Sequence, residues 1–325
     1  MENLKVIHYD LDGVLWIPGN FLENTLPLCI EKGMENGLDI ENKQEGLELI
    51  NQIRKAKGSN AQNHFDILVD ICNGQQRELK AQLKDSTDAT NIINETYPQY
   101  FNMKISSLGD QNYIMIQSMV CQYKNSKTSI MKPTLGAADV LDECLRRNYI
   151  LTIISNGYWS KQTDKLDELN LSHYFRHRQT EPDIKILDSL TQISDEVKSK
   201  EKPNPYLWQQ QRKKIEKYFG TYYQDREVHI GDKYMADIYG ANSLGIFTVK
   251  INQGSHADET IEDALRKMNI PTIHEKNAFE LLQPDVTIDR LTKLPSALSA
   301  IEKDYAGLLE KKHYQKHLGE KPTEI

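Results

Sequence analysis

The strongest constraint on the fold is an alternation of β-prone runs and helical segments that starts at the N-terminus, stops near residue 20 and resumes near residue 133. Alternating strands and helices joined by crossovers favour an α/β fold with a doubly wound, Rossmann-like parallel sheet. In such a sheet, ligands lie beyond the carboxyl ends of the strands. The expected strands are Leu4–Tyr9, Tyr149–Ile154, Tyr174–Arg178, Glu227–Ile230, Ile246–Ile251 and Val286–Ile288.

Helices are expected in the intervals between these strands and after the last one. The expected helical ranges are 137–147, 159–169, Pro205–Phe219, Ala236–Leu244 and 295–311. Pro205 is expected at the first helical position, where its missing N–H leaves no hydrogen bond unmade. The tail after Lys312, with the basic cluster Lys311–His317, is expected to be charged and frayed.

Residues 20–131 differ from the rest because their apolar residues recur at helical spacing and strand signals are weak. Phe65, Leu68, Val69 and Cys72 follow the i, i+3, i+4, i+7 pattern of one helix face. The sequence therefore predicts a helical domain over 20–131, inserted into an α/β core made of 1–19 and 132–325.

The charge balance limits the classes of partner. Among 325 residues the formal net charge is −7, which would repel nucleic acid and anionic membranes. We therefore expect neither partner, although a small anionic substrate can still bind in a local positive pocket. The sequence does not predict the oligomeric state.

Four scattered cysteines, Cys29, Cys72, Cys121 and Cys144, form no CxxC pair, which argues against a zinc site or a disulfide framework. They are expected to be buried thiols in a reducing compartment. The chain shows no signal segment and no apolar run long enough to span a membrane, so a cytoplasmic protein is expected.

Two carboxylates directly follow the first expected strand, in Asp10-Leu11-Asp12-Gly13. A carboxylate can attack phosphorus to form an aspartyl-phosphate, and a second acid can protonate the leaving oxygen and then activate water. Taken alone, the same residues are equally consistent with an ordinary Asp-Gly turn with solvated acids.

Three further polar sets follow later strands and should converge on the same edge of the sheet. In Ser155-Asn156-Gly157 a hydroxyl and backbone amides precede a helix, a setting that suits phosphate oxygens. Lys202-Pro203-Asn204-Pro205 supplies a positive charge for a phosphate and its transition state. Each of these two sets taken alone is more often an ordinary loop.

The fourth set is Gly231-Asp232 with Asp237, which adds two carboxylates to those of Asp10 and Asp12. Four clustered acids repel one another, and a hard dication relieves that repulsion. Mg²⁺ suits the site because it prefers oxygen ligands and is commonly held by a few carboxylates together with substrate phosphate. The sequence therefore predicts Mg²⁺ as a cofactor.

Together the four ordered sets resemble the signatures of the haloacid dehalogenase superfamily of hydrolases, in its phosphatase-type members with a helical cap. The resemblance covers about 1–20 and 132–290. It implies Asp10 as nucleophile and metal ligand, and Asp12 as general acid and base with its backbone carbonyl on the metal. It also implies Ser155 and Asn156 as phosphate-binding residues, Lys202 as a partner of both phosphate and Asp10, and Asp232 and Asp237 at the metal.

The resemblance also bears on the reaction and on the inserted segment. Residues 20–131 occupy the position of the family's helical cap, which closes over the active site. The polar stretch 180–200 is longer than expected and would form a surface excursion or a substrate-side loop. Trp16 either lines the pocket under the cap or packs in the core.

Asp12 favours phosphoryl transfer over dehalogenation, because a halide leaving group needs no proton donor. We expect hydrolysis of a small phosphorylated metabolite. A phosphomutase and a catalytically silent binding module of the same fold are the alternatives.

Overall fold

The computed structural model describes residues 4–57, 63–74, 76–84, 86–98, 109–175, 191–193, 198–221, 223–268 and 272–320. The chain divides into two compact units. One comprises Met1–Gly19 with Lys132–Ile325, and the other comprises Asn20–Met131. The second unit therefore spans the residues for which an inserted helical domain is expected.

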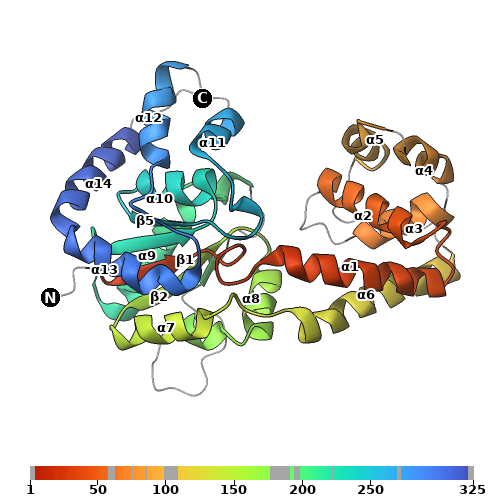
Figure 1. Cartoon of the computed structure of the whole chain (residues 1–325), viewed down its shortest axis with the longest axis horizontal. Helices are drawn as coiled ribbons and strands as arrows, with labels where there is room; N and C mark the ends of the chain where they lie inside the picture. Colours follow the sequence, from red (N-terminus) through yellow and green to blue (C-terminus); the bar gives the residue numbers. More distant parts are fainter. Residues whose placement is uncertain are drawn as a thin grey trace. The chain divides into compact units, whose positions relative to one another are not determined.

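The larger unit is built on a six-stranded parallel sheet in the order β3-β2-β1-β4-β5-β6 (Figure 1). This is the doubly wound order of a Rossmann-like fold, so the expected fold class is confirmed. β1 lies in the middle, where Val6 pairs with Ile150 on one side and with Glu227 on the other. The strands are β1 (Val6–Tyr9), β2 (Ile150–Ser155), β3 (Thr191–Ile193), β4 (Glu227–Gly231), β5 (Phe247–Ile251) and β6 (Val286–Ile288).

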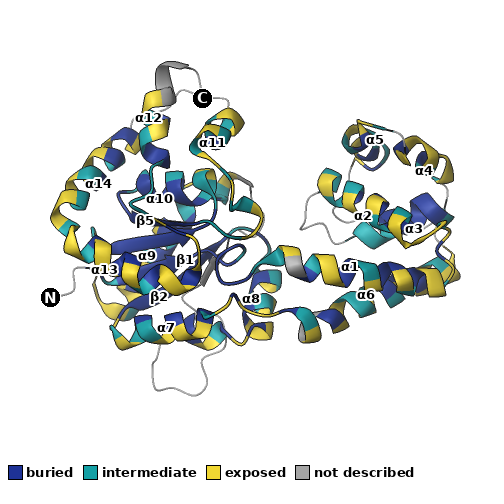
Figure 2. Ribbon diagram, in the orientation of Figure 1, coloured by how far each residue is buried: buried dark blue, intermediate teal, exposed yellow. Residues whose placement is uncertain are grey.

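The sheet is buried on both faces because helices cover each of them. Every residue of β1, β2, β4 and β5 is buried, as the dark strands in Figure 2 show. One face of β1 carries Tyr9, whose hydroxyl donates to Cys144 Sγ of α7 (3.4 Å). The other face carries Val6, which packs with Ile215 of α9. Near-continuous apolar strands are what such two-sided burial requires.

The helices expected over 137–147, 159–169 and Pro205–Phe219 are observed to within one residue, whereas the helices after β4 differ from the expected ranges. The α-helices are α7 (Ala137–Arg146), α8 (Trp159–Glu168), α9 (Tyr206–Phe219), α10 (Gly240–Asn242), α11 (Ile261–Met268), α12 (Thr272–Leu282), α13 (Leu294–Lys303) and α14 (Tyr305–Glu320). The 3₁₀ turns are η1 (Ser172–Phe175), η3 (Lys198–Lys200), η5 (Gly254–His256) and η6 (Leu291–Lys293), and η4 (Tyr234–Tyr239) is a π-helical turn.

Two sequence predictions in this unit need correction. The strand expected at Tyr174–Arg178 is wrong at its start, because Tyr174 lies in η1; residues 176–178 are outside the described part. The third strand is instead β3, inside the polar stretch 180–200, of which 180–190 and 194–197 are not described. The frayed tail is also wrong, since α14 runs to Glu320 and buries Lys312, Gln315 and Leu318. These side chains can be buried only if α14 packs against the rest of the unit, so the helix is not frayed.

The second unit is helical throughout its described part. It contains most of α1 (Pro18–Glu35), together with α2 (Lys43–Lys57), α3 (His64–Asn73), α4 (Arg77–Lys84), α5 (Ala89–Thr96) and α6 (Asp110–Ile130). Its core includes Leu68, Val69 and Cys72 of the stripe seen in the sequence, whereas Phe65 is half-buried against it. Cys29, Cys72 and Cys144 are buried free thiols, but Cys121 is exposed, contrary to expectation. Every helix of the described residues is too short or too polar to cross a bilayer.

Candidate active site

Lys202 contacts residues at or just beyond the ends of three neighbouring strands in the middle of the sheet. Its Nζ lies 2.9 Å from Asp10 Oδ1, just beyond β1, and 2.6 Å from Asp237 Oδ1, in η4 after β4. It also donates to the carbonyl oxygen of Ile154 in β2 (3.1 Å). The Asp10 backbone N–H donates to the carbonyl of Ile230 (2.9 Å), which holds the turn after β1 against β4. The first, third and fourth polar sets of the sequence therefore meet at one point.

Asp232 completes a group of three buried carboxylates. One oxygen each of Asp10, Asp232 and Asp237 lies within 4.8 Å of the others. Gly13 makes this approach possible: a Cβ there would lie 2.0 Å from Asp232 Oδ2, and its backbone has φ +88°, a conformation that favours glycine. Gly231 similarly allows the Asp237 side chain to reach the end of β4, since a Cβ there would lie 2.1 Å from Asp237 Cβ.

The electrostatics of the group depend on burial and on the lysine. Burial disfavours the ammonium of Lys202, but Asp10 and Asp237 outweigh this effect and raise its pKa. Burial would also raise the pKa of Asp237, but Lys202 and His229 hold that pKa well below its usual range. Burial, together with Asp237 and Asp10, raises the pKa of Asp232 to about 8. Burial raises the pKa of Asp10 despite the opposing effect of Lys202.

The carboxylate group fits a magnesium ion. Its donors are oxygens, which Mg²⁺ prefers. Asp232 Oδ1 is buried and has no hydrogen-bond partner among the described residues, so it can serve as a ligand without breaking a protein contact. Asp237, in contrast, accepts from Lys202 at Oδ1 and from the Lys233 N–H at Oδ2 (3.0 Å). This difference favours Asp232 as a direct ligand and Asp237 as an indirect one.

Asp12 lies at the same turn but outside this carboxylate group. Both of its oxygens contact Lys165 Nζ of α8, at 2.7 and 2.9 Å, and Gln162 Nε2 contacts Oδ2 at 3.2 Å. A quarter of its side chain remains exposed (27%), whereas Asp10 is almost completely buried. Two acids only two residues apart therefore have different surroundings, as different roles would require. Its expected metal contact, through the backbone carbonyl, stays a prediction.

The second polar set also lies at this edge, although its two members contact different atoms. Ser155, the last residue of β2, is buried, and its hydroxyl donates to the carbonyl of Asn156 (3.3 Å). The Asn156 side chain accepts from the Lys202 backbone N–H (2.8 Å) and donates to the Lys202 carbonyl (3.4 Å). The Asn156 side chain thus positions Lys202, and phosphate binding by Ser155 and Asn156 stays a prediction.

Several residues that the sequence analysis did not single out support the site. His229 Nε2 lies 3.2 Å from Asp237 Oδ1, and burial lowers the pKa of His229 to about 4, so the neutral ring donates to the carboxylate. Gln253 donates to the carbonyls of Gly13 (2.8 Å) and Val14 (2.9 Å) and so holds the turn after β1. The available signal was a polar residue between two apolar residues of an expected strand, as at His229 between Val228 and Ile230.

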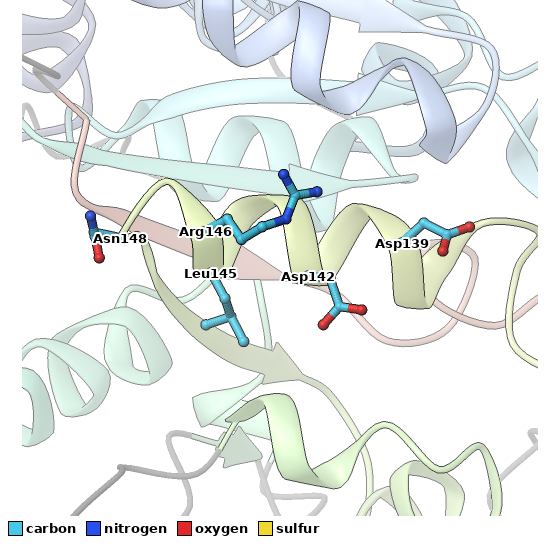
Figure 3. Close-up of a pocket in the computed structure, with 5 residues that line it drawn as sticks. All are labelled: Asp139, Asp142, Leu145, Arg146 and Asn148. Atoms are coloured by element: carbon cyan, nitrogen blue, oxygen red, sulfur yellow. The ribbon is translucent and has the colours of Figure 1, made fainter.

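A pocket of about 540 Å³ lies elsewhere, along the outer side of α7 (Figure 3). It is lined by Asp139, Asp142, Leu145, Arg146 and Asn148, all on or just after that helix. None of the predicted site residues lines it. The pocket combines charges of both signs on one helix, and Arg146 is already paired with Glu143 (2.5 Å). We assign the chemistry to the carboxylate group and not to this pocket.

Comparison with known proteins gives consistent results. Residues 62–251 match the model of the haloacid dehalogenase-like hydrolases. The glyceraldehyde 3-phosphate phosphatase of Methanothermobacter thermautotrophicus is 24% identical over 264 residues, covering 81% of this chain and 92% of that protein. The enzyme of the same name from Pyrococcus furiosus is 26% identical over 262 residues, covering 81% and 86%.

Among solved structures, a haloacid dehalogenase-like family hydrolase from Xanthomonas campestris aligns with 94% of this chain and 95% of its own. Its TM-score is 0.49 at 14% identity. The family assignment therefore rests on the sequence match, whose range includes Ser155, Lys202, Asp232 and Asp237. Asp10 and Asp12 precede that range, and the fold brings Asp10 into contact with Lys202.

Proposed function

Because the chain belongs to the haloacid dehalogenase-like hydrolases, we propose that it transfers the phosphoryl group of its substrate to Asp10 and then to water. It is a phosphatase for a small phosphorylated metabolite, the activity for which its curated relatives are named. The observation that carries the mechanism is the position of Lys202, whose ammonium joins the Asp10 and Asp237 carboxylates at the centre of the sheet edge.

In the first step, an oxygen of Asp10 attacks phosphorus and the bond from phosphorus to the ester oxygen breaks. Lys202 holds Asp10 through Oδ1 and supplies positive charge where the transferring group is most negative. Asp12, which is less buried than Asp10 and enters this step in its protonated form, donates its proton to the departing alcohol oxygen and becomes a carboxylate. An alcohol leaves and Asp10 carries the phosphoryl group.

In the second step, Asp12 accepts a proton from water, and that water attacks the phosphorus of the aspartyl-phosphate. The bond between phosphorus and Asp10 breaks, inorganic phosphate forms, and the Asp10 carboxylate is restored. Asp10 and Asp232, assisted by Asp237, would hold Mg²⁺, which would shield the negative charge between the carboxylate and the phosphoryl group.

We propose that the helical unit, residues 20–131, is the cap that excludes water and selects the alcohol part of the substrate. In the proposed steps the core residues act on the phosphoryl group and on the ester oxygen, which all phosphate monoesters share, so they would not distinguish one small phosphate ester from another. Glyceraldehyde 3-phosphate, named for the curated relatives, belongs in the first panel of substrates.

The test is phosphate release from that panel with and without Mg²⁺, comparing the wild type with Asp10→Asn. Asp139→Asn, an exposed change on α7, is the matched control. We expect Asp10→Asn to lower release by about 10⁴-fold or more, as loss of a covalent nucleophile does elsewhere, and Asp139→Asn to leave it unchanged. Release that survives in Asp10→Asn would rule out the covalent mechanism.

A further inference from the structure

The Asp12 carboxylate is held by two side chains of one helix face. Gln162 and Lys165 are three residues apart on α8, so they project from the same side of that helix. Lys165 Nζ reaches both oxygens, at 2.7 and 2.9 Å, and Gln162 Nε2 reaches Oδ2 at 3.2 Å. Contact through both oxygens restricts rotation of the carboxylate as well as its position.

Gln162 is itself fixed by a second contact. Its Nε2 also donates to the carbonyl oxygen of Asn156 at 2.7 Å, and the residue is 2% exposed. Because both neighbours are acceptors, the amide must present its NH₂ group to them. Asn156 in turn binds the backbone of Lys202. Gln162 therefore connects Asp12 to the loop that carries Lys202.

Lys165 is also restrained from its other side. Its ammonium lies 4.9 Å from the centre of the Trp16 ring, within the range of a cation–π contact. Trp16 belongs to the turn that carries Asp12, because the Gly13 N–H donates to the Trp16 carbonyl (2.7 Å). The ammonium is thus held between the carboxylate and an aromatic ring of one turn, with 19% of the side chain exposed.

We propose that Lys165 and Gln162 are positioning residues that aim the Asp12 carboxylate at the ester oxygen of the substrate. This inference rests on the proposed function, in which Asp12 passes a proton to that oxygen. The side-chain contacts of both residues in the described structure are with Asp12, Asn156 and Trp16, and not with Asp10. Their loss should affect proton donation to the leaving group, and leave attack by Asp10 largely intact.

The leaving group provides a readout that a merely structural role would not change. An alkyl phosphate such as glycerol phosphate expels a poor leaving group, which needs a proton as its bond breaks. The nitrophenolate of para-nitrophenyl phosphate leaves as a stable anion and needs no proton. A misdirected Asp12 should therefore slow the alkyl ester much more than the aryl ester, whereas general damage to the site should slow both equally.

The experiment measures kcat/KM of the Mg²⁺-loaded protein for these two esters in Lys165→Met, Lys165→Arg and Lys161→Met. Lys161→Met removes the same charge from the same helix and is the matched control. For Lys165→Met we expect a loss of about 10–100-fold on the alkyl ester and about twofold on the aryl ester, a part of the 10²–10⁴-fold that general acids contribute. Lys165→Arg should recover part of the alkyl activity, because it restores the cation.

Equal losses of Lys165→Met on both esters, or a loss no larger than that of Lys161→Met, would overturn the inference while leaving the phosphatase in place. A wild type that releases phosphate from neither of these esters nor from any ester of the substrate panel would overturn both. If Lys165→Met does not fold, Lys165→Arg and Gln162→Leu decide in the same way. The ratio of kcat/KM for the alkyl ester to kcat/KM for the aryl ester should be lower in Lys165→Arg than in the wild type, and lower still in Gln162→Leu.

Discussion

Lys202 and Lys312 are both buried lysines surrounded by oxygen acceptors, and their surroundings differ in charge. Lys202 lies at the carboxyl edge of the sheet beside Asp10 and Asp237. Lys312, on α14, lies 2.7 Å from Asp285 Oδ2, 2.8 Å from Gln315 Oε1, and against Asn242 Oδ1. The acceptors around Lys202 are mainly carboxylate oxygens, whereas those around Lys312 belong to one carboxylate and two neutral amides.

The charge balance of the two clusters explains why we assign chemistry to one of them. Around Lys202 the three carboxylates interact with two ammonium groups, those of Lys202 and Lys233, and the pKa of Asp232 is raised to about 8 by burial and its acidic neighbours. Around Lys312 the single carboxylate, Asp285, is shared with Lys311 (3.1 Å). The first cluster keeps an excess of negative charge, which calls for a further cation. In the second cluster the one carboxylate already has two lysine partners, so the cluster can serve to dock a helix.

The largest effect is expected from removing Lys202. For Lys202→Met we expect kcat to fall by about 10²–10³-fold, the usual effect of removing one donor to a transition state. The protein should also be less stable, because the buried carboxylates lose their counter-charge. Steady-state kinetics and urea unfolding measure the two effects, with Lys312→Met as the matched Lys-to-Met control. Wild-type kcat in Lys202→Met would contradict the assignment.

A cation should stabilise the acidic cluster in its own right. Saturating Mg²⁺ should raise the wild-type Tm, since a ligand at about 100 times its Kd adds about 2.7 kcal/mol to the folded state. Asp232→Asn removes the carboxylate with the free buried oxygen and should reduce that shift. Thermal scans with Mg²⁺ and with EDTA give the comparison, and they need no substrate. Equal shifts in both proteins would place the ion elsewhere.

The opposite behaviour is expected of Lys312. Lys312→Met should leave kcat within about twofold of the wild type and change the free energy of unfolding by about 1–3 kcal/mol, the range for buried groups that lose a polar partner. Asp285 stays paired with Lys311 in this variant, which keeps the effect below that of an isolated buried charge. A large fall in kcat with unchanged stability would mean that α14 takes part in the reaction.

The smallest expected effect is a pH-dependent contribution of Lys312 to stability. Burial lowers the pKa of Lys312 from its ordinary 10.5 to about 8, despite the attraction of Asp285. Between these values the unfolded chain holds a proton that the folded protein has released, so the stability contributed by this group rises with pH. The slope is at most about 1.4 kcal/mol per pH unit for one group. The difference in the free energy of unfolding between the wild type and Lys312→Met should rise between about pH 8 and 10.5. This difference should not vary with pH in that range if Lys312 stays charged in the folded protein.

The sequence was sufficient for residues whose position follows from the sheet alone. Asp10, Ser155 and Asp232 each lie at or just after the end of a parallel strand, and parallel strands bring their carboxyl ends to one edge. Strand–helix alternation was therefore enough to predict that they converge. The partners of Asp12 were harder to predict, because Gln162 and Lys165 depend on how α8 is rotated about its own axis.

The cluster around Lys312 shows why the C-terminal prediction was wrong. A run of basic residues near a chain end looks solvated, and the sequence gives no sign that Asp285 and Asn242 will meet it. Those partners lie 27 and 70 positions away and are brought together only by the packing of α14. In the same way, the apolar pair Tyr174-Phe175 resembles a strand, but both residues are buried in a 3₁₀ turn.

The central claim is that Asp10 carries the phosphoryl group, and trapping that group tests it most directly. Wild-type protein turning over substrate with Mg²⁺ would be quenched in acid, and its intact mass and the peptide containing Asp10 would be measured. We predict added mass of one phosphoryl group on Asp10, absent from Asp10→Asn and from samples without substrate. A phosphoryl group on any other residue, or active turnover without one, would contradict the account.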